Sequence, residues 1–135
     1  MISLLPNLHA ELSNHFRSTD PVRAVVHQFG CALAYELADV PHGADICRLV
    51  ALHIATSSKD PALCLDTARK LIAHYRSAGD ADVGRKVAHG VGTAISVLMD
   101  AGQGQDALAL AHELAATGWP DAESTAGNFI DFLTR

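Results

Sequence analysis

Aromatic residues are scarce in this sequence, at 5% of 135 residues, and charged residues are also few, at 19%. Sandwiches of β-sheets draw heavily on tyrosine, phenylalanine, threonine and isoleucine, so the shortage argues against that class. The longest stretch without a charged residue, 87–99, falls well short of the roughly 20 apolar residues of a membrane span. Residues 1–6 lack the basic start of a secretory signal. We therefore expect a soluble, cytoplasmic protein with no membrane partner.

Positive charge is also in short supply, because ten lysines and arginines stand against fifteen carboxylates, for a net charge of -5. A nucleic-acid partner needs basic residues that neutralise phosphates, so we expect none here. The charges are unevenly placed, with six of the ten bases between 59 and 86 and six acids but only Arg135 from Asp100 onward. Solvated helix faces are the simplest interpretation. Complementary patches that meet across a homodimer, or that each await a foreign partner, are the alternatives.

Cysteine is limited to three residues, Cys31, Cys47 and Cys64, each within an apolar run. An odd number of cysteines argues against a disulfide scaffold. Buried, reduced thiols are the better interpretation, and they agree with a cytoplasmic location.

What the sequence has in abundance is apolar residues, 49% of the chain, at helical spacing. Val83, Val87, Val91, Ile95 and Leu98 follow the three-four rhythm of one helix face, and similar stripes recur along the chain. One of these comprises Val22, Val25, Val26, Phe29, Ala32, Leu33 and Leu37. The pattern predicts an all-α fold with about seven antiparallel helices, arranged as stacked hairpins in a solenoid or a compact bundle. We place them near 3–17, 21–38, 43–57, 61–78, 82–100, 104–117 and 121–134, in one domain that spans 1–135.

Capping residues support these boundaries. Asp20-Pro21 and Asp60-Pro61 each place a carboxylate before a proline at the first helical position. Gly79, Gly102 and Gly118 follow apolar stripes, where a left-handed residue commonly ends a helix. The segment 43–57 is apolar nearly all round, which predicts a helix enclosed by its neighbours.

Small residues recur four apart at Gly84, Ala88, Gly92 and Ser96. Glycine inside a helix costs about 0.5–1 kcal/mol relative to alanine, so its presence calls for a compensating contact. Close packing against another helix is the plain explanation, and a ligand that approaches the backbone is the alternative.

The stretch 91–120 resembles a tetratricopeptide-type helical hairpin. Gly102 lies in the expected turn, Asp106-Ala107-Leu108 opens the second helix, and Trp119-Pro120 ends the unit. Ile95 and Leu114 stand where that family usually has small residues, and the apparent repeat is longer. The resemblance covers about a quarter of the chain and implies a scaffold that binds peptides or helices of other proteins. It transfers no functional residues.

Eight histidines raise the question of catalysis or metal binding. His27 and Cys31 share one helix face as a candidate pair of metal ligands, but no second Cys/His pair completes the set. Nucleophile elbows, zinc-protease motifs and phosphate-binding loops are absent, and His89-Gly90-Val91-Gly92 lies inside a helix stripe. We therefore assign no catalytic, cofactor-binding or metal residues and expect no cofactor.

These observations favour a non-enzymatic protein-interaction module, an adaptor or small chaperone-like protein that binds another protein or peptide on a helical-hairpin surface. A small helical enzyme or ligand-binding domain that uses histidines in an inter-helix pocket is the alternative. Since the chain has limited interior for its apolar content, part of that surface is expected to meet a partner, including a second copy in a homodimer.

Overall fold

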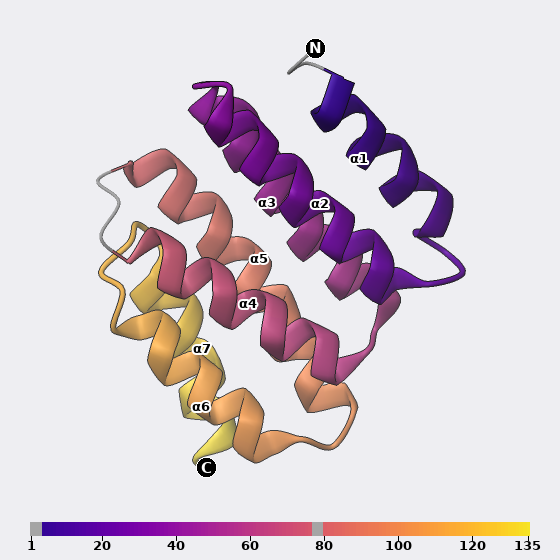
Figure 1. The fold of residues 1–135 in the computed structure, drawn as a ribbon. Coiled ribbons are helices and arrows are strands. Elements are labelled where there is room, and N and C mark those ends of the chain that lie inside the picture. Colours follow the sequence, from indigo (N-terminus) through magenta and orange to yellow (C-terminus); the bar gives the residue numbers. More distant parts are fainter. Residues whose placement is uncertain (1–3, 77–79) are drawn as a thin grey trace. The chain divides into compact units, whose positions relative to one another are not determined.

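The computed structural model describes residues 4–76 and 80–135, and in these ranges it is all-helical with no strand (Figure 1). This confirms the predicted fold class. The helices are α1 (Leu4–Phe16), α2 (Pro21–Leu37), α3 (Pro41–Ser58), α4 (Pro61–Tyr75), α5 (Ala81–Asp100), α6 (Gly104–Ala115) and α7 (Ala122–Leu133). The predicted ranges match within a few residues. The third helix starts two residues before its predicted start, with Pro41 at the first helical position.

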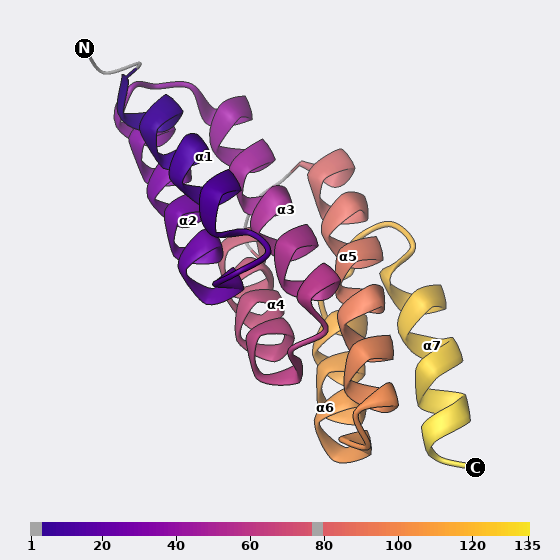
Figure 2. The same ribbon diagram turned by 90° about the vertical axis from the view of Figure 1, so that its right-hand side faces the viewer.

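The chain divides into two compact units, residues 1–58 and 59–135. In the first unit, α2 contacts both α1 and α3. The segment 43–57, for which the sequence predicts an enclosed helix, belongs to α3, which buries eight of its 18 residues, although Ile46 is 49% exposed. In the second unit, α5 contacts α4, α6 and α7, and α6 pairs with α7 (Figure 2). The consecutive pairs α2–α3, α4–α5 and α6–α7 are each in contact, as helical hairpins require. A single domain over 1–135 stays a prediction.

The helix ends follow the predicted capping chemistry. The Asp20 carboxylate accepts a hydrogen bond from the backbone N–H of Arg23, and the Asp60 carboxylate accepts from Ala62 and Leu63. Asp80, which the sequence reasoning did not single out, caps α5 in the same way. Gly102 and Gly118 have φ values of 76° and 72°, which confirms left-handed residues after α5 and α6. Gly79 lies outside the described residues.

The row of small residues on α5 is a packing surface in the second unit. A Cβ atom added to Gly84 would lie 2.8 Å from the Trp119 ring, and one added to Gly92 would lie 2.9 Å from Cγ2 of Thr125. Ala88, between them, is fully buried. Close packing is therefore the correct explanation at both glycines, where side chains occupy the space that a ligand would need.

Ion pairs within the second unit engage much of the basic cluster. Lys70 pairs with Asp66 at 3.0 Å and Lys86 with Asp82 at 3.1 Å, as the four-residue spacing predicts. Bases also reach acids of the C-terminal region, since Arg69 lies 3.1 Å from Glu113. Arg85 likewise lies 3.5 Å from Asp121. Basic and acidic residues of the two patches therefore form ion pairs within one chain.

No helix in the described ranges is both long and apolar enough to cross a membrane.

Candidate functional site

The apolar stripe predicted on α2 does not form a single buried face. Val25 and Ala32 are buried, together with Ala24, Cys31 and Ala34. The remaining large side chains of the stripe point outward instead: Val22 is 50% exposed, Val26 61%, Leu33 57% and Leu37 75%. The stripe is therefore only partly buried, because apolar residues lie on both the inner and the outer side of α2.

The outward side chains form one continuous strip, which we call the outer α2 face: Val22, Val26, Phe29, Leu33 and Leu37. Their spacing of four, three, four and four residues places them on one side of the helix. Phe29, partly buried, lies at the middle of the strip. Val40, just beyond the helix, is also exposed. Exposed apolar residues scattered singly are ordinary, whereas these side chains are neighbours on one side of the helix.

A groove of about 380 Å³ lies within the first unit and is lined by α1, α2 and α3. Tyr35 of α2 and Ile46 of α3 line it together with two cysteines, Cys31 and Cys47. Its walls approach closely because Gly43 lets the Tyr35 ring lie against the backbone of α3, where a Cβ atom would be only 2.9 Å from the ring. The groove therefore combines apolar walls with two thiols.

The two thiols in the groove contact each other. Sγ of Cys47 donates to Sγ of Cys31 at 2.7 Å, and both residues are buried. Burial, followed by the hydrogen bond and the charge interaction with Cys31, raises the pKa of Cys47 to about 12, although Arg48 acts in the opposite direction. Burial and the negative charge of Asp60 raise the pKa of Cys64 to about 11. Because thiolates are the reactive form, Cys47 and Cys64 are poor nucleophiles at neutral pH.

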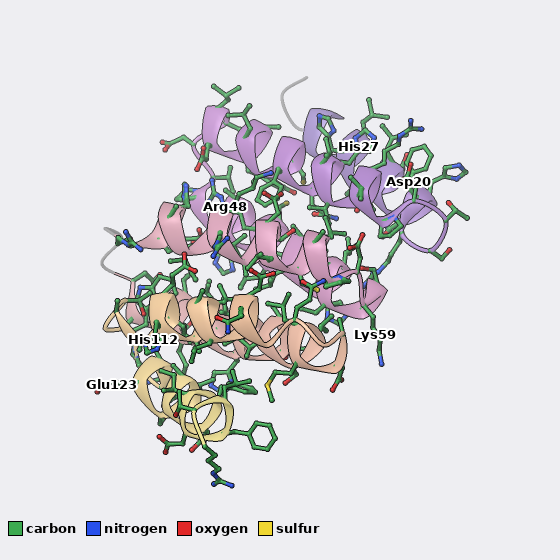
Figure 3. All side chains as sticks on the ribbon, turned by 90° about the horizontal axis from the view of Figure 1, so that it is seen from below. Asp20, His27, Arg48, Lys59, His112 and Glu123 are labelled. Atoms are coloured by element: carbon green, nitrogen blue, oxygen red, sulfur yellow. The ribbon has the colours of Figure 1, made fainter. Side chains whose placement is uncertain are left out.

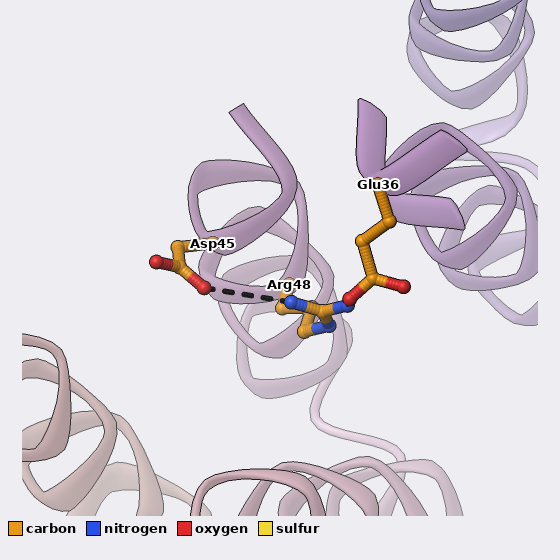
Figure 4. Close-up of polar contacts among 3 residues, drawn as sticks. All are labelled: Glu36, Asp45 and Arg48. Carbon is orange, nitrogen blue, oxygen red and sulfur yellow. Dashed lines mark hydrogen bonds and ion pairs between the residues drawn. The ribbon is translucent and has the colours of Figure 1, made fainter. Parts of the chain in front are cut away.

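A buried arginine links α2 to α3 in the same unit. The Arg48 guanidinium lies between two carboxylates (Figure 4) and forms ion pairs with Glu36 and, at 3.4 Å, with Asp45. Its side chain is only 8% exposed, whereas the Glu36 side chain is 42% exposed. A buried cation held by acids from two elements fixes the position of α3 against α2.

The candidate metal ligands His27 and Cys31 have different partners in the structure. Nδ1 of His27 lies 3.2 Å from Nδ1 of His9, and the His27 ring stacks on Phe16, whereas Cys31 contacts Cys47. Figure 3 labels His27 and Asp20, which both belong to the first unit. Among the described residues, no group of three or more His, Cys, Asp or Glu side chains could hold a metal ion.

The histidine-lined pocket of the alternative hypothesis has no counterpart in the groove of the first unit. None of the described residues that line this groove is a histidine. His89 contacts the exposed carboxylate of Asp121 at 3.1 Å, in the second unit.

The fold and these surfaces define an all-α protein built of helical hairpins. Comparison with known protein families, curated proteins and solved structures gives no match. The tetratricopeptide resemblance of residues 91–120 accordingly stays a prediction, although Gly102 and Trp119 take the turn and packing positions described above.

Proposed function

We propose that this chain is a non-enzymatic protein-interaction module, of the adaptor or small chaperone-like kind, and that the outer α2 face is its docking surface. The observation that carries the proposal is the continuous exposure of Val22, Val26, Leu33 and Leu37. A helix with an exposed apolar strip is suited to pack against another helix through side chains at i, i+4, i+7 and i+11. The three cysteines form no disulfide, which agrees with a reducing, cytoplasmic location.

The occupant that we propose is a second copy of the chain. The strip is symmetric about the peptide bond between Phe29 and Gly30, because Val26 and Leu33 are equally far from it, as are Val22 and Leu37. A two-fold axis at this point brings Val22 of each copy opposite Leu37 of the other, with the two α2 helices antiparallel. A symmetric dimer requires such a self-complementary surface.

The size of the outer α2 face fits a dimer of modest affinity. Five such side chains offer roughly 500 Å² per copy, so two copies bury about 1,000 Å², near the lower limit for a specific interface. Antiparallel helices also bring opposite ends of their macrodipoles together. We expect a reversible dimer that dissociates on dilution.

Leu33→Glu is expected to shift the dimer to monomer. Burial of one leucine contributes about 1.5–3 kcal/mol, and the substitution enters a symmetric dimer twice, so the dissociation constant should rise tenfold or more. Sedimentation velocity across the micromolar range measures it. Since Leu33 is 57% exposed, the circular dichroism spectrum should stay unchanged.

Phe132→Glu is the matched control, because Phe132 is 59% exposed but belongs to α7 in the second unit. This variant should dimerise like the wild type. A wild type that stays monomeric throughout, or equal effects of the two substitutions, would overturn the outer α2 face as a self-docking surface.

A further inference from the structure

Two independent features bring Cys31 and Cys47 together in the first unit. Both thiols belong to a buried cluster of small residues with Ala32 and Ala44, which allows α2 and α3 to approach closely. The Tyr35 ring packs on this cluster and against Gly43, where only a glycine leaves room for it. The sulfur atoms, 2.7 Å apart, are closer than in ordinary van der Waals contact, and a bonded pair lies at about 2.05 Å.

Both cysteines of this buried pair also border the groove of the first unit. Cys31 and Cys47 both line the groove of about 380 Å³, which Gln28 and Arg17 also border. Cys64 differs, because it is buried in α4 of the second unit and does not line this groove. The groove therefore distinguishes the adjacent pair from the third thiol.

We propose that Cys31 and Cys47 form a dithiol site that a low-molecular-weight disulfide, such as oxidised glutathione, converts to a protein disulfide between α2 and α3. One cysteine, as the thiolate, attacks the small disulfide, forms a mixed disulfide and releases one glutathione thiolate. The second cysteine loses its proton and attacks the sulfur of the first, which expels the second glutathione. Two protein thiols are oxidised, one glutathione disulfide is reduced to two glutathiones, and the protons are conserved.

The proposed site differs from a catalytic disulfide in its rate. Because burial keeps the Cys47 thiol protonated at neutral pH, the exchange is slow and follows the redox poise of the surroundings rather than brief pulses of oxidant. The resulting disulfide would link α2 to α3 covalently beside the groove. The disulfide is independent of the outer α2 face, since neither cysteine belongs to it.

Incubation of the whole chain with oxidised glutathione, followed by acid quenching and mass spectrometry, tests this site. We expect a species lighter by two hydrogen atoms, a peptide that joins Cys31 to Cys47, and its loss on addition of dithiothreitol. Cys64→Ser should form the same species, whereas Cys31→Ser and Cys47→Ser should not. The wild-type peptide map decides the matter even if one of these variants fails to fold.

Three results would overturn the dithiol site. In the first, the wild-type protein keeps all three thiols through prolonged incubation. In the second it accumulates only glutathione adducts, and in the third its disulfide peptide contains Cys64. The test does not depend on the oligomeric state, because Leu33→Glu should oxidise in the same way. Failure of the dimer and failure of the dithiol are thus separate outcomes.

Discussion

Loss of the two acids that face Arg48, by Glu36→Gln together with Asp45→Asn, is expected to lower the free energy of unfolding by about 3–5 kcal/mol. The Arg48 side chain is 8% exposed, so it has little water to replace the lost carboxylates. The amides keep the shape of the acids but supply no negative charge. Denaturation followed by circular dichroism measures the loss.

Addition of Arg48→Met to that double variant should recover much of the stability. The methionine removes the buried cation and fills part of its volume, so no uncompensated charge is left. If the triple variant were less stable than the double variant, the guanidinium would stabilise the first unit by packing and other contacts more than by charge.

Gly92→Leu is expected to be strongly destabilising as well. Its Cβ atom alone would meet Cγ2 of Thr125 at 2.9 Å, and the larger leucine side chain would also press toward Phe129. Overpacking of this kind costs about 1–3 kcal/mol or more, which exceeds the gain of less than about 1 kcal/mol from replacing a helical glycine. The midpoint of chemical denaturation should fall accordingly.

Gly127→Ala is the matched control for the α5 glycine. Gly127 is also inside a helix, but no atom lies within 4 Å of the position of its Cβ. Alanine there should therefore raise the free energy of unfolding by about 0.5–1 kcal/mol. If both substitutions changed the free energy of unfolding in the same direction, α5 and α7 would not pack closely at Gly92.

Helix periodicity and capping residues predicted most of the helical structure, because capping residues interact with backbone groups only a few positions away in the sequence. Asp20-Pro21 and Asp60-Pro61 fix helix starts through one or two hydrogen bonds, and Gly102 supplies a left-handed residue. Pro41 was missed at the start of α3 because the residue before it, Val40, is not a capping residue. Left-handed backbone at Asp39, Lys59 and Asp121 was also not anticipated, since only glycine signals it clearly.

The candidate surfaces could not be predicted from the sequence, because they depend on contacts between helices that the spacing of residues along one helix does not determine. The α2 stripe reads as one amphipathic face, but which of its sides meets α1 and α3 is decided by packing. A helical projection would have shown that apolar residues surround α2 almost completely, which was the available signal for an outer face. The meeting of Cys31 and Cys47 depends on the register of α2 against α3, so neither the spacing nor the cysteine count predicted it.

The single tryptophan gives the two units different optical signatures. Trp119 packs on Gly84 and is 9% exposed, and the first unit contains no tryptophan. Indole fluorescence therefore follows the second unit alone, whereas ellipticity follows the helices of both. Whether the two signals change together or at different denaturant concentrations will reveal whether residues 1–135 unfold as one cooperative domain.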